Sequence, residues 1–163
     1  MKYAHSLLVL CFTSIAGTAA ANGNCQSASL QLFGKTDHGP QNQNRNYNEK
    51  NDGVGLKIYK SEKILWACTY LEADYIRNSV RGRTSYVSVG AEWKYKNENN
   101  PLALVAGLNI GHMDYEVPGK GHVRRWLPLP FIAIDAYDGY RINFTPLPGK
   151  VKMFYVSIPL NFF

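Results

Sequence analysis

The sequence predicts an all-β protein, an eight-stranded antiparallel up-and-down transmembrane β-barrel. Three observations lead to this prediction. A secretory-type leader opens the chain, eight segments with strand-like alternation of side chains follow it, and the gaps between those segments are alternately long and short. Transmembrane barrels have short turns at one rim and longer loops at the other. The spacing therefore assigns all the long gaps to one end of the barrel.

The leader has the three parts of a secretory signal peptide. Lys2 supplies a positive start, an apolar run spans 7–12, and small residues at 19–21 offer a cleavage site. The apolar run is too short and too interrupted for a membrane-spanning helix. We therefore predict a signal peptide over 1–21 and one barrel domain over 22–163, exported to the bacterial outer membrane.

The mature chain is basic. Only Lys2 leaves with the leader, so 17 Lys and Arg remain against 12 Asp and Glu. A basic exported protein fits acidic partners such as phosphorylated glycolipids and anionic phospholipid headgroups, although the same excess also serves ordinary solubility. We expect lipid partners, namely lipid A and phospholipid, no nucleic acid, and a monomer.

Eight strands are expected in chain order. The apolar side of the alternation is clearest at Leu65, Ala67, Thr69 and Leu71; at Val87, Val89, Ala91 and Trp93; at Leu102, Leu104, Ala106, Leu108 and Ile110; at Tyr140, Ile142 and Phe144; and at Phe154, Val156, Ile158, Leu160 and Phe162. The predicted strands are 27–34, 53–60, 63–74, 84–95, 101–113, 126–137, 139–145 and 151–163. The predicted inner turns are 61–62, 96–100 and 138, and the predicted outer loops are 35–52, 75–83, 114–125 and 146–150. The aromatic end, Phe162 and Phe163, is typical of outer-membrane barrels.

Two cysteines remain after the leader, in a compartment that permits disulfides. Cys25 precedes the first predicted strand, whereas Cys68 falls in the middle of the third. This separation makes their pairing the less favoured outcome. No Cys-x-x-Cys or His/Cys cluster is present, so we expect no metal and no cofactor.

Four charges are predicted to face the lumen: Lys57, Glu72, Glu92 and Arg141. Ionised groups in a narrow barrel must be paired or hydrated. A salt-bridged plug is the favoured interpretation. An eight-stranded barrel is just wide enough to be filled by side chains or to hold one slender ligand, which argues against an open channel.

The predicted outer loops carry the reactive side chains. A serine hydroxyl needs a neighbouring base to become a nucleophile, and the loops carry His38 and His122 together with Ser79, so a histidine and a serine brought to one rim can act as base and nucleophile. Arginines at the same rim match phosphate oxygens. The candidate phosphate-binding residues are Arg77, Arg81, Arg83, Arg124 and Arg125.

Seven short segments resemble, in order and approximate spacing, the PagP lipid A palmitoyltransferases. They are Asn46-Tyr47-Asn48-Glu49, Gly53-Val54-Gly55-Leu56, Arg77-Asn78-Ser79, Gly90-Ala91-Glu92-Trp93, the run 107–111, Leu127-Pro128-Leu129-Pro130 and Phe144-Thr145-Pro146. No single motif is specific, and the shared order carries the resemblance. Members of that family are eight-stranded outer-membrane barrels that transfer a palmitoyl chain from a phospholipid to lipid A.

The resemblance implies a catalytic set of His38, Asn78 and Ser79, where Asn78 replaces the family's aspartate. An amide can orient an imidazole but cannot stabilise its charged form as a carboxylate does. The resemblance also places the floor of an acyl pocket at Gly90 and Glu92, where the family has a glycine in place of the glutamate. A carboxylate there is expected to shorten the pocket or to close it through an ion pair with Lys57 or Arg141.

Pro128, Pro130 and Pro146 are expected to interrupt strand pairing, either as simple strand ends or as lateral openings for lipid, which the family uses. The His-x-Ser motif of deacylase barrels is missing. Two functions stay open: a lipid A or phospholipid acyl-chain enzyme, which is favoured, and a non-enzymatic adhesive or membrane-stabilising barrel.

Overall fold

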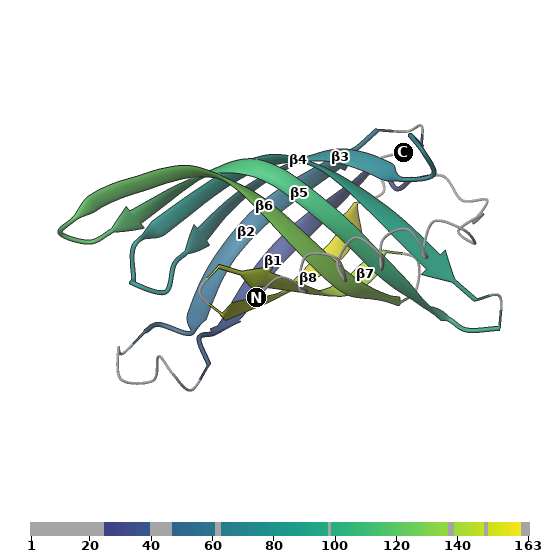
Figure 1. Cartoon of the computed structure of the whole chain (residues 1–163). Helices are drawn as coiled ribbons and strands as arrows, with labels where there is room; N and C mark the ends of the chain where they lie inside the picture. The colour runs from purple at the N-terminus through teal and green to yellow at the C-terminus, as the bar shows by residue number, and fades with distance from the viewer. Residues whose placement is uncertain are drawn as a thin grey trace, which may run out of the picture.

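The computed structural model is a closed barrel of eight antiparallel strands, in which each strand pairs with its neighbour in the chain and β8 closes on β1 (Figure 1). It describes residues 25–39, 47–60, 63–97, 99–136, 139–148 and 150–160. The strands are β1 (Ala28–Asp37), β2 (Lys50–Tyr59), β3 (Cys68–Arg77), β4 (Arg83–Lys96), β5 (Leu102–Val117), β6 (Gly121–Ala136), β7 (Tyr140–Leu147) and β8 (Val151–Leu160). The predicted all-β up-and-down barrel, its strand number and its strand order are confirmed. The predicted leader, Phe162 and Phe163 lie outside the described residues.

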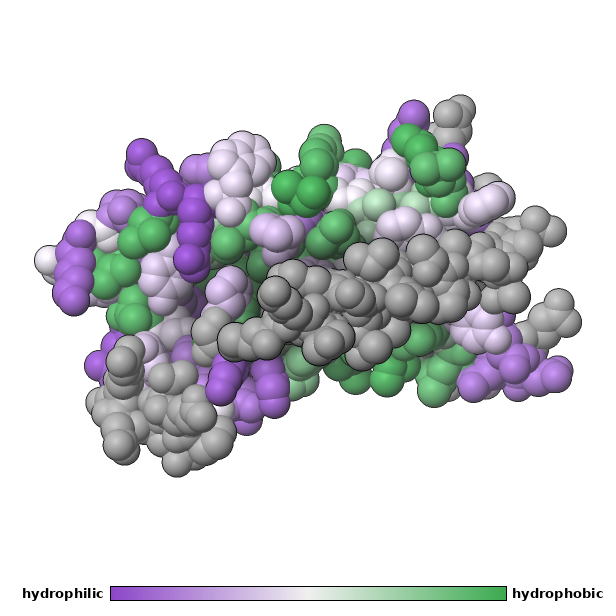
Figure 2. Space-filling model, viewed as in Figure 1, coloured by the Kyte–Doolittle hydropathy of each residue, from purple (hydrophilic) through white to green (hydrophobic). Residues whose placement is uncertain are grey.

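The barrel is apolar outside and polar inside. Val54, Leu71, Val87, Val89, Leu104, Ile132, Ile134 and Ile142 are exposed, whereas Ser29, Gln31, Lys57, Glu72, Glu92, Asp135, Asn143 and Ser157 are buried. On the face drawn in Figure 2, hydrophobic side chains lie along the middle of the barrel and hydrophilic ones gather toward its ends. The predicted direction of the alternation is therefore confirmed within the observed strands, but it is wrong at Trp66, which is exposed, and at Ala67, which is buried.

The two ends of the barrel differ. The termini end carries Ala28, the last residue of β8, and the connections 60–67, 97–101 and 137–139. The loop end carries the connections 38–49, 78–82, 118–120 and 148–150. The predicted loop 114–125 is wrong, because β5 and β6 continue as a projecting hairpin to Val117 and Gly121 (Figure 1). Beyond the barrel both faces of this hairpin meet solvent, so the backbone pairing continues while the apolar alternation fades.

The start of the third strand was also predicted wrongly. Leu65 and Trp66 have positive φ angles of 50° and 61°, and they form a tight turn closed by the Ile64–Ala67 bridge. The strand therefore begins at Cys68, at the termini end. This shift brings Cys68 beside Cys25, and the two form a disulfide with their Cα atoms 5.6 Å apart. The expectation that they stay unpaired is corrected by this finding.

Glycines on β4 and β5 make room for aromatic rings that cross the lumen. A β-carbon on Gly90 would overlap the Tyr70 ring, and one on Gly107 would overlap the Phe131 ring. Both rings belong to the buried cluster Tyr59, Tyr70, Val105, Phe131 and Ala133, against which the disulfide packs. The termini half of the lumen is therefore filled by side chains.

Candidate functional site

The half of the lumen nearer the termini end holds a network of buried ion pairs centred on Arg141 of β7. Its guanidinium lies 2.5 Å from Glu92 Oε1 and 2.8 Å from Asp135 Oδ2. Tyr59 donates its hydroxyl hydrogen to Glu92 at 3.1 Å. Lys94 reaches the same Asp135 at 3.1 Å. Each carboxylate in this group has at least one cationic partner.

Lys57 of β2 joins this network to the middle of the lumen. Its ammonium lies 3.9 Å from Glu72 and 3.8 Å from Glu92. It also lies over the rings of Tyr70 and Phe131, at 4.1 and 4.7 Å from their centroids. The salt-bridged plug predicted from Lys57, Glu72, Glu92 and Arg141 is confirmed. Asp135 and Lys94 were not among the predicted lumen charges, although the alternation of side chains in β6 and β4 already places both on the inward face.

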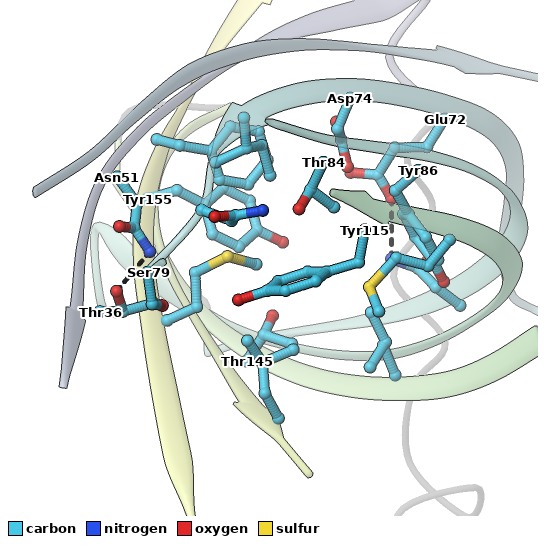
Figure 3. Close-up of a pocket in the computed structure, with 18 residues that line it drawn as sticks. Thr36, Asn51, Glu72, Asp74, Ser79, Thr84, Tyr86, Tyr115, Thr145 and Tyr155 are labelled. Carbon is cyan, nitrogen blue, oxygen red and sulfur yellow. Dashed lines mark hydrogen bonds between the residues drawn. The ribbon is translucent and has the colours of Figure 1, made fainter. Parts of the chain in front are cut away.

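Above the plug, a cavity of about 90 Å³ occupies the loop half of the lumen (Figure 3). Its lower end is formed by Glu72 and Asn109, where Asn109 donates to Glu72 at 2.7 Å. Neither Gly90 nor Glu92 lines it. The predicted floor is therefore placed too deep, because the Tyr70 ring covers Gly90 and the plug holds Glu92.

Strand pairing between β6 and β7 ends beside this cavity. Pairing between β6 and β7 runs from Ala136↔Tyr140 only as far as Ile132↔Phe144, whereas β6 continues beyond it to Gly121 on the β5 side alone. Pro128 and Pro130 lie in the unpaired stretch, where a proline leaves no N–H unsatisfied. Leu129 of the same stretch and Thr145 of β7 line the cavity. The expected interruption of pairing is therefore observed at Pro128 and Pro130 on the β7 side, whereas Pro146 pairs with Lys152 of β8.

Of the three predicted catalytic residues, only Ser79 and Asn78 line the cavity. Ser79 lies at its mouth, and its backbone carbonyl accepts the N–H of Asn48 at 2.8 Å. His38 is buried and stacks on Tyr47, with ring centroids 4.5 Å apart, and it is not part of the cavity wall. The structure therefore places the predicted base and the predicted nucleophile at the same end of the barrel without joining them at the cavity.

The side chain of Asn78 holds the β3–β4 turn. Its amide nitrogen donates to the carbonyls of Arg83 and Glu116 at 3.1 and 2.7 Å, and its oxygen accepts the N–H groups of Val80 and Gly82 at 3.1 and 2.9 Å. Both donors and the acceptor are thus engaged by backbone. The predicted role of Asn78 in orienting His38 is replaced by a structural one.

His38 is expected to make stability depend on pH. Burial lowers its pKa more than the nearby carboxylates of Glu49 and Asp37 raise it. The unfolded chain, with an ordinary pKa of about 6.5, then binds more protons than the folded chain below that pH. The free energy of unfolding should fall as the pH is lowered through about 6.5. In urea titrations, the wild type should lose stability relative to His38→Phe, which keeps a ring against Tyr47, when the pH is lowered from 7.5 to 5.5. A difference that is the same at both pH values would contradict this assignment.

The five predicted phosphate-binding arginines all lie at the loop end and are exposed. Arg77 and Arg83 face each other directly across β3 and β4, and the Arg83 guanidinium lies 5.5 Å from the centroid of the Tyr75 ring. Asp114 pairs with Arg124 at 2.9 Å and with His122 at 2.7 Å. Like charges opposite each other repel, and a bound anion relieves this repulsion. Arg77 and Arg83 are therefore the best-placed phosphate contacts, whereas Arg124 already has a carboxylate partner.

The chain matches no family model, and no curated protein matches it significantly in sequence. Among the described residues, no group of three or more His, Cys, Asp or Glu side chains is arranged to hold a metal ion. Within the same residues, no helix is long and apolar enough to cross a membrane.

Proposed function

We propose that this protein is an outer-membrane barrel that acts on lipids at the outer leaflet, with its loop end facing outward. The apolar outer wall and polar lumen suit a membrane-spanning barrel, because side chains facing lipid must be apolar while the lumen can hold polar groups. Closure of β8 on β1 leaves no long sheet edge facing lipid in the termini half.

The observation that carries a lipid-directed function is the unpaired stretch between β6 and β7 beside the cavity. A chain of an outer-leaflet lipid could enter there and lie against Leu129 and Leu147, with Ser79 at the mouth. A bound chain would end at Glu72 and Asn109, above the plug.

The proposed reaction is acyl transfer from, or removal from, phospholipid or lipid A. Ser79 Oγ attacks the ester carbonyl and loses its proton to a base, the ester bond breaks, and the leaving alcohol takes up a proton. The acyl group then passes from Ser79 to a hydroxyl of the acceptor lipid or to water. His38 is the proposed base, and it would have to approach Ser79 when the lipid binds, because it does not line the cavity in this structure. Arg77 and Arg83 are the proposed contacts for lipid phosphate.

Mass spectrometry of lipid A and phospholipids tests this proposal. Cells that express the protein should show an acyl chain gained or lost relative to cells without it, and Ser79→Ala should abolish the change. Ser85→Ala is the matched control, since Ser85 is exposed on the outer wall of β4. An unchanged lipid profile, or full activity of Ser79→Ala, would refute the proposed acyl-transfer function of Ser79.

The ion-pair plug favours a second candidate, a non-enzymatic barrel that stabilises the membrane or serves adhesion. A lumen closed by Lys57, Glu92 and Arg141 gives rigidity and requires no substrate. This candidate predicts an unchanged lipid profile together with greater sensitivity of cells lacking the protein to detergent.

A further inference from the structure

One wall of the cavity is polar and lacks internal partners. Asp74 of β3 and Thr84 and Tyr86 of β4 face into it (Figure 3), with only 8, 8 and 4% of each residue exposed. Among the described residues, Asp74 Oδ1, Thr84 Oγ1 and the Tyr86 hydroxyl have no hydrogen-bond partner. The hydroxyls of Tyr86 and Ser88 lie near each other without forming a hydrogen bond of normal geometry. Buried polar groups in native proteins nearly always have a hydrogen-bond partner, so a bound ligand is expected to supply the partners that this wall lacks.

Within the described part of the chain, Asp74 also lacks an ion-pair partner. No Lys, Arg or His side chain among the described residues forms an ion pair with Asp74. The nearest lumen cation in the network, Lys57, is already shared between Glu72 and Glu92. Glu72 lines the same cavity just below Asp74. An anion entering the cavity would therefore meet two carboxyl groups. The acyl chain of the proposed function would leave Asp74 without a partner, so an ammonium ligand and an acyl chain are alternative occupants of this cavity.

The opposite wall is aromatic and aliphatic. Phe33 and Tyr155 stack with ring centroids 4.8 Å apart, and Leu129 and Met153 lie beside them in the cavity lining. Tyr115 extends across the middle of the cavity in Figure 3. Aromatic faces together with a carboxylate form the usual environment for organic ammonium groups. The cavity thus offers an ammonium site on one side and an apolar site on the other.

We propose that the loop half of the lumen binds an organic cation, an ammonium group attached to an apolar body. The ammonium donates hydrogen bonds to the Asp74 carboxylate and to the hydroxyls of Thr84 and Tyr86. The apolar body lies against Phe33, Leu129 and Met153. The ligand reaches the cavity from the loop end or through the unpaired stretch between β6 and β7.

Calorimetric titration of the purified barrel in neutral detergent micelles tests this site, with empty micelles as the blank. Hexylammonium should bind saturably, whereas hexanoate, which has the same chain length and the opposite charge, should not. Asp74→Asn keeps the shape and removes the charge, and it should weaken hexylammonium binding about tenfold or more. Asp52→Asn, on the exposed outer face of β2, should leave the binding unchanged.

Three results would overturn the site: no saturable binding of hexylammonium, equal binding of hexanoate, or undiminished binding by Asp74→Asn. Circular dichroism and heat-dependent gel mobility show whether each variant is folded. Thr84→Val keeps the side-chain shape and should weaken hexylammonium binding, although less than Asp74→Asn does. Because the two variants test the same wall independently, the site can still be tested if one of them does not fold. The measurement is independent of acyl transfer, because it uses no lipid substrate and leaves Ser79 intact.

Discussion

Replacing Arg141 with methionine is expected to lower the free energy of unfolding by about 3–5 kcal/mol. The guanidinium pairs with both Glu92 and Asp135, and all three side chains are at least nine-tenths buried. Methionine fills a similar space but leaves two carboxylates with fewer cationic partners in a site that water does not solvate. Removing one member of a buried ion network exposes the full desolvation penalty of those that remain.

Urea unfolding in lipid vesicles, followed by tryptophan fluorescence, measures the effect. Arg124→Met is the matched control, because the pair Arg124–Asp114 lies exposed on the β5–β6 hairpin, and such surface pairs contribute at most about 1 kcal/mol. Adding Glu92→Gln and Asp135→Asn to Arg141→Met should restore part of the loss, since the variant then buries fewer unpaired charges. Equal effects of Arg141→Met and Arg124→Met would show that the plug does not stabilise the barrel.

Replacing Cys25 and Cys68 with serine should cost about 4 kcal/mol, the loop-closure estimate for cysteines 43 residues apart. The disulfide ties the segment before β1 to the first residue of β3 and packs on the cluster around Tyr59. Without it, the unfolded chain gains freedom while the rest of the barrel keeps its pairing. The termini end should loosen first.

The urea midpoint of the double variant, compared with that of the wild type with and without dithiothreitol, checks this expectation. Reduced wild type should unfold near the midpoint of the double variant, and reductant should not shift the variant itself. A wild type that is insensitive to reductant and equal to the variant would mean that the disulfide contributes no stability.

Strand number, strand order and the inside-out polarity followed from local pattern. The side-chain period of a strand is two, so Val87 and Val89 on one face and Ser88 and Glu92 on the other are already separated in the chain. A buried plug was likewise predictable, because charges on the inward register of a narrow barrel have few options other than pairing. The ends of the strands were less predictable, since pairing can continue where the apolar alternation stops, as it does up to Val117.

The site depended on relations between strands that no local pattern contains. The stagger of β3 against the segment before β1 joined Cys25 to Cys68, and the β6–β7 pairing ended before it reached Leu129. The hydrogen bonds of Asn78 come from residues on both sides of its turn and from Glu116 on the neighbouring hairpin, so a motif could not reveal that its amide is already engaged. The same holds for Asp74, whose lack of an ion pair with any described cation appears only when the barrel closes and Lys57 pairs with Glu72 and Glu92. Alternation along a strand is a property of the covalent chain, whereas pairing, cavities and unmet charges arise from the register of eight strands closed on one another.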